Sequence, residues 1–231
     1  MEWFGVELER VREETPIDRS LILGLPPDRR EQFRFRPGQY IQLRLPEADG
    51  KLKGVYSLSS GPGDAEVEVT IRALGEAGGQ FAALPAGTRL EATMPRGNHL
   101  LDENMEAEAP DEGARRRVLV AQGAGVAPIR AYLRQLREVG HDGDVVLVHE
   151  EERPEHVLFQ DEFERHDGEC PWFRYVPVPP SVDAVTLEEL IKPPHRTVVF
   201  AIGATAFVDP VLAVARDLGV PADNLHRERW G

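Results

Sequence analysis

Two glycines in the segment AQGAGVAPIR (121–130) carry the clearest chemical signal in the sequence. Gly123 and Gly125 stand between an apolar run and a stretch with helical spacing, where they permit a positive φ or close approach of a ligand to the backbone. The helix that follows presents unpaired N–H groups that suit a pyrophosphate, and Pro128 fits its first turn. Because G-x-G-x-x-P differs from the usual G-x-G-x-x-G, a glycine turn that only reverses the chain is the alternative.

A second turn of this kind lies in AIGATAF (201–207), again between an apolar run and a helical stretch. Ligands gather at the carboxyl ends of the strands of a parallel sheet. We therefore expect Gly203 to lie beside Gly123 and Gly125 at one crevice. The alternative is a glycine that only starts a helix.

Tyr56 and Ser57, in GVYSLSSGP (54–62), have side chains suited to a planar ligand. Adjacent strand residues point to opposite faces, so the phenol can stack on a ring while the hydroxyl reaches a ring nitrogen. A tyrosine that merely covers a barrel is the alternative. Arg72, followed by GEAGGQF, can hold a phosphate together with helical N–H groups; a solvated arginine beside a flexible loop explains this stretch equally well.

Short runs separated by turn residues fill the first half of the chain. They predict strands over 20–25, 39–45, 54–60, 66–74 and 89–94, with one short helix at GGQFAALP (78–85). Closely spaced strands with turns such as LPPD, RPG and GPGD predict a small antiparallel β-barrel.

The second half, from Val118 onward, alternates apolar runs with helical patterns. This βαβ order predicts a parallel sheet covered on both faces, that is, an α/β nucleotide-binding domain. We therefore expect a barrel domain over 1–97, an acidic linker over 98–114 and an α/β domain over 115–231.

The composition excludes several classes of protein. The chain has 231 residues and a net charge of −13, so no global field attracts nucleic acid or anionic lipid. The lone Cys170 excludes an internal disulfide or a cysteine-ligated iron–sulfur cluster within the chain. No signal peptide and no run near the roughly 20 apolar residues of a membrane helix is present, which favours a cytoplasmic protein without membrane or nucleic-acid partners. No histidine shows metal-ligand spacing.

The order of these motifs resembles the ferredoxin–NADP reductase superfamily over about residues 5–231. The segments that carry the resemblance are FRPGQYIQLRLP, VYSLSS, VTIRAL with GGQFAAL, GAGVAP, VLFQDEF and RERWG. The resemblance implies an FAD-binding barrel, an NAD(P)-binding α/β domain and hydride transfer between nicotinamide and flavin. It further implies that Tyr56 stacks on the flavin, that Ser57 meets its N5 atom, and that Trp230 shields it.

Other roles follow from the same resemblance. Ser57 and Trp230 are the implied catalytic residues. Arg72 and the N–H groups of Gly79 to Phe81, with Lys53, would hold the FAD pyrophosphate. The full implied set for FAD is Lys53, Tyr56, Ser57, Ile71, Arg72, Gly78, Gly79, Gln80, Phe81 and Trp230. For the nicotinamide coenzyme it is Gly123, Gly125, Val126, Ala127, Pro128, Glu152, Gly203 and Ala204.

The sequence departs from the family pattern at three places. Gly54 stands where the family has an arginine for the pyrophosphate, and Phe81 where it has Ser or Thr. Ile202 to Thr205 replaces a Cys-Gly-Pro-Pro turn. In NADP-using relatives, the position of Glu152 usually holds an arginine for the 2′-phosphate. The acidic loop 149–153 therefore favours NADH, although a one-residue shift would bring Arg153 to that phosphate.

The expected function is a flavin-dependent NAD(P)H oxidoreductase. Its electrons should pass to a separate acceptor such as ferredoxin, because the chain has no second redox centre. The alternative is a non-catalytic nucleotide-binding or interaction module that keeps this scaffold.

Overall fold

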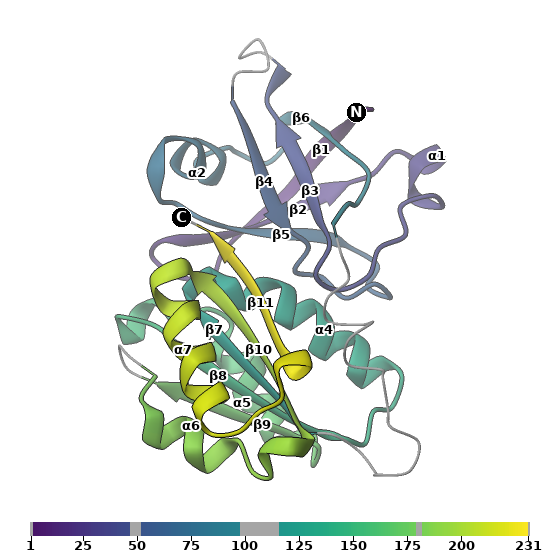
Figure 1. The fold of residues 1–231 in the computed structure, drawn as a ribbon. Helices are drawn as coiled ribbons and strands as arrows, with labels where there is room; N and C mark the ends of the chain where they lie inside the picture. The colour runs from purple at the N-terminus through teal and green to yellow at the C-terminus, as the bar shows by residue number, and fades with distance from the viewer. Residues whose placement is uncertain (1, 47–51, 98–115, 179–181, 231) are drawn as a thin grey trace. The chain divides into compact units, whose positions relative to one another are not determined.

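The computed structural model describes residues 2–46, 52–97, 116–178 and 182–230. The chain forms two compact units (Figure 1). Unit 1 comprises residues 1–99 and 127–139, and unit 2 comprises residues 100–126 and 140–231. The expected linker, 98–114, lies outside the described residues. The proposed barrel and α/β boundaries stay predictions, with one difference: residues 127–139 group with unit 1.

Unit 1 is built on a six-stranded antiparallel sheet; the antiparallel architecture was predicted from the sequence, but with five of these strands. Its strands are β1 (Phe4–Glu13), β2 (Asp18–Gly24), β3 (Tyr40–Arg44), β4 (Lys53–Ser57), β5 (Val67–Arg72) and β6 (Arg89–Ala92). They lie in the order β4-β3-β6-β1-β2-β5. A bridge between Leu58 and Val69 joins the two ends of this order, so the sheet closes on itself.

The first strand, β1, was missed in the sequence. Phe4, Val6 and Leu8 are buried and alternate with exposed residues, which is the period-2 pattern of a strand with one face in the core. The register with β2 shifts between Leu8 and Arg10. An irregularity of this kind interrupts the alternation after its third buried residue, Leu8, and the charged residues that follow obscure the strand pattern in the sequence.

Unit 1 also contains α1 (Pro27–Arg30) and α2 (Gly75–Ala82). Helix α2 begins three residues before the predicted segment. It can start there because Gly78 approaches the end of β5: a β-carbon at Gly78 would lie 2.6 Å from the Arg72 carbonyl oxygen. Phe81, near the end of α2, is fully buried in the barrel core and fixes the helix against it.

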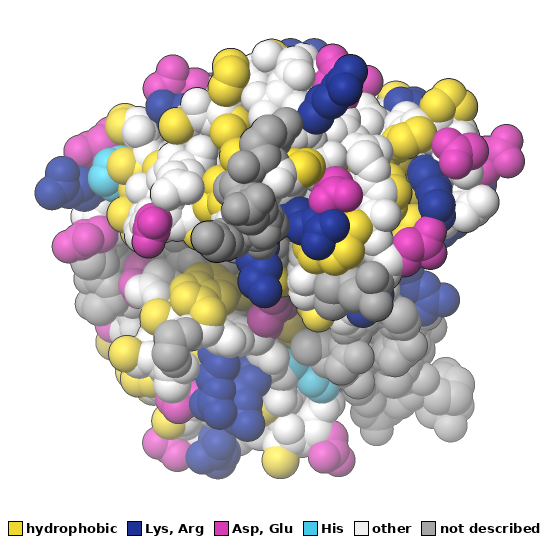
Figure 2. Space-filling view, turned by 90° about the horizontal axis from the view of Figure 1, so that it is seen from above, with side chains coloured by type: hydrophobic (Ala, Val, Ile, Leu, Met, Phe, Trp, Pro, Cys, Tyr) yellow, Lys and Arg dark blue, Asp and Glu magenta, His cyan; other side chains and the backbone are white. Residues whose placement is uncertain are grey.

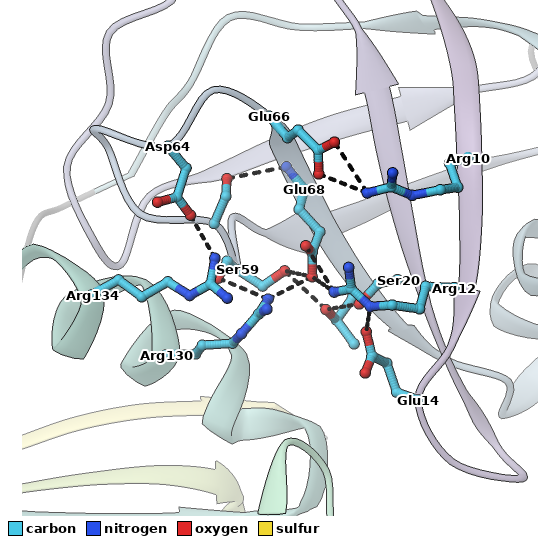
Figure 3. Close-up of polar contacts among 12 residues, drawn as sticks. Arg10, Arg12, Glu14, Ser20, Ser59, Asp64, Glu66, Glu68, Arg130 and Arg134 are labelled. Atoms are coloured by element: carbon cyan, nitrogen blue, oxygen red, sulfur yellow. Dashed lines mark hydrogen bonds and ion pairs between the residues drawn. The ribbon is translucent and has the colours of Figure 1, made fainter. Parts of the chain in front are cut away.

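Helix α4 (Val126–Glu138) is attached to unit 1 by a buried polar network (Figure 3). Arg130 Nη1 donates to Glu68 Oε1 at 2.5 Å and to the Ser59 carbonyl at 3.3 Å. Glu68 also accepts from Arg12 at 2.9 Å, and Ser59 approaches the same carboxylate at 3.3 Å. Burial alone would raise the pKa of Glu68, but the charges of Arg130 and Arg12 outweigh it and lower that pKa.

Unit 2 contains a five-stranded sheet in which every pair is parallel, as predicted. Its strands are β7 (Arg116–Gln122), β8 (Asp144–Glu150), β9 (Phe173–Val178), β10 (Thr197–Ala204) and β11 (Leu225–Trp230), in the order β11-β10-β7-β8-β9. Helices α6 (Ala184–Leu190) and α7 (Thr205–Asp217) cover one face, and α5 (Gln160–Glu169) lies on the other (Figure 1). A short 3-10 turn, Pro154–His156, precedes α5, which begins at Gln160.

Candidate functional site: a dinucleotide half-site and a flavin half-site

The strand order of unit 2 places a switch point between β7 and β10. From β7 the chain proceeds outward through β8 and β9, and then returns to β10 on the other side of β7. Ligands of open α/β sheets bind at the carboxyl ends of strands at such a point. The turn Gly123–Gly125 follows β7 there, and Ala204 ends β10 beside it.

Both glycines of this turn have a structural requirement. Gly123 has a φ of 52°, a conformation that favours glycine. At Gly125 a β-carbon would come within 2.8 Å of the Trp230 ring and 3.0 Å of the Ile202 carbonyl oxygen. The next residues, Val126, Ala127 and Pro128, are buried in the first turn of α4, so only their backbones can serve a ligand.

The structure brings Gly203 to the same edge of the sheet, where it makes room for Gln122. A β-carbon at Gly203 would lie 2.9 Å from that of Gln122. The Gln122 side chain accepts from the Ala204 N–H at 3.2 Å and donates to Glu150 at 3.0 Å. Gln122 thus links the ends of β7, β8 and β10. The sequence analysis missed it, although it directly precedes Gly123.

The acidic loop after β8 separates into buried and exposed carboxylates. Glu150 is buried and accepts from Gln122 and from the Val182 N–H at 2.9 Å. Glu151 is also buried and accepts from the Glu152 N–H at 3.0 Å. Glu152 is exposed, as is Arg153 after it. Within this acidic run, Glu152 is therefore the carboxylate best placed to meet a ligand from solvent.

The last strand carries a carboxyl group that the sequence analysis did not single out. Glu228 lies two residues before Trp230 on β11, so both side chains share one face of the strand. Burial raises the pKa of Glu228. Trp230 contacts Gly125 while 47% of it stays exposed. Its packing against Gly125 is what a side chain that covers this sheet would show, and its role toward a flavin stays a prediction.

In unit 1, β4 presents the predicted flavin residues. Tyr56 lies directly over Gly54, where any β-carbon would overlap the phenol ring. Its ring also meets Phe81 edge-on, with centroids 5.5 Å apart and planes at 76°. Burial raises the pKa of Tyr56 to about 12. The two departures Gly54 and Phe81 are therefore linked, since the tyrosine ring occupies the space between them. Ser57 is half-buried on the opposite face.

Arg72 is held by a buried carboxylate. Its Nε and Nη2 donate to the two oxygens of Asp18 at 2.9 and 3.1 Å, and the Asp18 side chain is fully buried. Asp18 also accepts from the Thr15 hydroxyl at 2.7 Å. A phosphate at Arg72 would have to compete with this pair. The neighbouring Ile71 is buried in the core, and Lys53 is exposed at the start of β4.

The backbone donors assigned to Gly79, Gln80 and Phe81 need correction. Because α2 begins at Gly75, these N–H groups lie beyond its first turn, where a helix directs them to carbonyls four residues earlier. The N–H groups that have no acceptor within the helix are those of its first residues, Gly75 to Ala77. A phosphate at α2 would meet these donors, close to the end of β5.

The described residues contain neither a membrane-spanning helix nor a metal-binding cluster. No helix there is long and apolar enough to cross a bilayer. No group of three or more His, Cys, Asp or Glu side chains is arranged to hold a metal ion in the described ranges.

Comparison with known proteins agrees with this architecture. The family described as "Oxidoreductase NAD-binding domain" matches residues 119–191. The ferredoxin reductase component of 3-ketosteroid-9-alpha-monooxygenase from Rhodococcus rhodochrous is 27% identical over 94% of this chain and 62% of its own length. Ferredoxin–NADP reductase B from Sorangium cellulosum is 27% identical over 98% of this chain and 97% of its own.

A solved structure shares the fold. The ferredoxin NADP+ reductase from Neisseria gonorrhoeae, with bound FAD and NADP, superposes with a TM-score of 0.81 at 21% identity and covers 99% of both chains. The chain is therefore similar in sequence to reductases of the ferredoxin–NADP reductase type, and it shares their fold. It spans 62–63% of the length of three oxygenase reductase components that it matches.

Proposed function

We propose that this protein is a reductase in which FAD held by unit 1 accepts a hydride from NADH held by unit 2, with the electrons passing on to a separate acceptor. The observation that carries the proposal is the turn Gly123–Gly125 at the switch point of the parallel sheet, next to Gly203 and Trp230. When bound, the flavin supplies the redox chemistry: it takes two electrons with the hydride and releases them to the acceptor.

The residues of unit 1 fit the flavin ring better than its diphosphate. Tyr56 offers an aromatic face and Ser57 a hydroxyl, while the first N–H groups of α2 are the available phosphate donors. Arg72 is already bound to Asp18. A charge-assisted hydrogen bond contributes about 1.5–3 kcal/mol, so a missing cation would weaken FAD binding roughly 10- to 100-fold. We therefore expect FAD to bind more weakly than in relatives with the family arginine.

Glu152 supports NADH as the coenzyme. An exposed carboxylate after β8 can accept hydrogen bonds from ribose hydroxyls, and it repels a 2′-phosphate. Steady-state oxidation of both coenzymes with an artificial acceptor tests this choice. The wild type should have a higher kcat/KM with NADH than with NADPH, and Glu152→Arg should reduce the ratio of these two values. Glu155→Arg, an exposed position three residues on, is the matched control. A higher kcat/KM with NADPH in the wild type would contradict the assignment.

The acceptor is proposed from the relatives. Several are named as reductase components of oxygenases, and one as a ferredoxin–NADP reductase. A ferredoxin-type redox protein is therefore the acceptor to test first. Figure 2 shows several Lys and Arg side chains next to Asp or Glu on the face in view, and a group of Lys and Arg side chains gathered toward its lower edge.

The second candidate is a module without turnover. The Arg72–Asp18 pair and the Tyr56 ring over Gly54 favour it, because both reduce what unit 1 offers a diphosphate. The colour of the purified protein separates the two functions. A yellow preparation that releases FAD on denaturation supports the reductase, whereas a colourless protein that does not bind added FAD supports the module.

A further inference from the structure

We propose that His149 is a positioning residue for the dinucleotide. Its side chain fixes the orientation of the Gly123 peptide, and Tyr175 determines which nitrogen of the His149 ring carries the proton. This inference rests on the proposed function, because it concerns the turn that would bind the coenzyme. The sequence showed His149 only as a histidine without metal-ligand spacing.

The geometry connects three strands and the turn. His149 is on β8 and is fully buried. Its Nε2 lies 3.3 Å from the Gly123 carbonyl oxygen, and its Nδ1 lies 3.3 Å from the Tyr175 hydroxyl on β9. A line of polar groups thus runs from β9 through β8 to the end of β7.

The chemistry of these groups assigns the protons. A carbonyl oxygen only accepts, so Nε2 must carry the hydrogen that is donated to Gly123. In the neutral ring Nδ1 then has a lone pair, which accepts from the Tyr175 hydroxyl. Burial, with a smaller contribution from Glu164, raises the pKa of Tyr175, which keeps this donor protonated. Both hydrogen bonds are satisfied with no buried charge.

Aromatic neighbours hold the imidazole in this orientation. Phe163 of α5 meets it edge-on, with centroids 6.4 Å apart and planes at 85°. The Phe163 ring also lies 5.3 Å from that of Tyr175. A flipped imidazole would place carbon atoms against the Gly123 oxygen and the Tyr175 hydroxyl, so the packing and the hydrogen bonds select the same orientation.

Fixing one carbonyl also aims the next N–H. In a trans peptide the C=O and the following N–H point in opposite directions. With the Gly123 oxygen held toward His149, the Ala124 N–H is directed away from β8. The Val126 N–H also donates to the Gly123 and Ala124 carbonyls, which closes the turn. His149 therefore holds the Ala124 N–H in a fixed direction in the turn just before α4, where a phosphate oxygen would bind.

The test uses His149→Leu, which removes the donor, and His149→Gln, whose amide can replace Nε2–H. His166→Gln is the matched control, since His166 is a buried histidine of α5. Two quantities are measured on the FAD-free full chain: hydrogen exchange of the Val126 amide without ligand, and the affinity for NAD+ by calorimetry. We expect His149→Leu to accelerate exchange and weaken NAD+ about tenfold, while both glutamine variants stay within about threefold of wild type.

The outcomes separate the two proposals. Wild-type exchange and NAD+ affinity in His149→Leu would overturn the role of His149. Accelerated exchange in that variant, combined with no NAD+ binding in the wild type, would support the positioning of the turn and contradict the proposed function. If His149→Leu does not fold, Tyr175→Phe is used instead. This variant removes the hydroxyl that donates to Nδ1, so the hydrogen of the His149 ring is no longer confined to Nε2. Faster exchange of the Val126 amide would then support the proposal, and wild-type exchange would overturn it.

Discussion

The indole of Trp230 lies over the backbone of Gly125, so closely that a β-carbon at position 125 would come within 2.8 Å of the ring. The Ile202 carbonyl oxygen bounds the same space at 3.0 Å. The last strand of the chain and the glycine turn after β7 therefore share one surface. A substitution in the glycine turn should therefore displace the Trp230 ring, and a substitution of Trp230 should alter the packing of the turn.

Gly125→Ala should displace Trp230 and weaken NAD+ binding by about tenfold, because overpacking of this size costs roughly 1–3 kcal/mol. Calorimetry gives the affinity, and near-UV circular dichroism reports the tryptophan environment. Gly168→Ala on α5 is the control, since no atom lies within 4 Å of its β-carbon position. Unchanged NAD+ affinity and an unchanged tryptophan signal in Gly125→Ala would contradict a role of the Trp230–Gly125 contact in coenzyme binding.

Glu228 should make stability depend on pH. Burial raises the pKa of its folded form above the usual 4.5, so its contribution is complete below that value and is lost as pH rises through the folded pKa. Glu228→Gln removes this loss. The variant should therefore gain stability relative to wild type as pH rises from about 4 to 8 in urea unfolding. A difference that does not vary with pH argues against a raised pKa of Glu228 in the folded protein.

Gly54 and Tyr56 give a paired test of the flavin half-site. Gly54→Ala should move the phenol ring into solvent and lower the Tyr56 pKa from about 12 toward the usual 10, read as the difference from the same protein with Tyr56→Phe in an absorbance titration. Gly79→Ala is the control, as nothing lies within 4 Å of that β-carbon position. A Tyr56 pKa that stays near 12 in Gly54→Ala contradicts the packing.

Gly54→Arg moves the same ring and adds a cation. It should tighten FAD binding roughly 10- to 100-fold relative to Gly54→Ala in a fluorescence titration. Comparison of the two variants separates the charge from the movement of Tyr56. Equal affinities would place the pyrophosphate elsewhere.

The buried ion pair of α4 should matter far more than the exposed one on the same helix. Arg130 and Glu68 are each 4% exposed, whereas Arg134 and its partner Asp64 are 29% and 33% exposed. Arg130→Met removes one of the two arginines that pair with the buried Glu68 carboxylate and should cost about 3–5 kcal/mol in urea unfolding. Arg134→Met should cost about 1 kcal/mol or less. Adding Glu68→Gln to Arg130→Met should recover part of the loss; equal costs for both arginines would contradict this account.

Much of unit 2 could be predicted from sequence because its strands are continuous apolar runs. The apolar run DVVLVHE coincides with β8 (Asp144–Glu150), and the glycine turns were predicted from strand-to-helix transitions. The ion pair of Arg72 could not be predicted, since its partner Asp18 is 54 residues away and reaches it only through the β2–β5 register. His149, Gln122 and Glu228 gain their roles from neighbours on adjacent strands, which no local pattern displays.

The most direct measurement of the central claim is anaerobic mixing of the FAD-loaded protein with NADH while the visible absorbance of the flavin is followed. The account predicts loss of the oxidised flavin spectrum, faster with NADH than with NADPH, and recovery when a ferredoxin-type acceptor or an artificial one is added. A protein that binds FAD and NAD+ yet leaves the flavin oxidised, or one that binds no FAD at all, would contradict it.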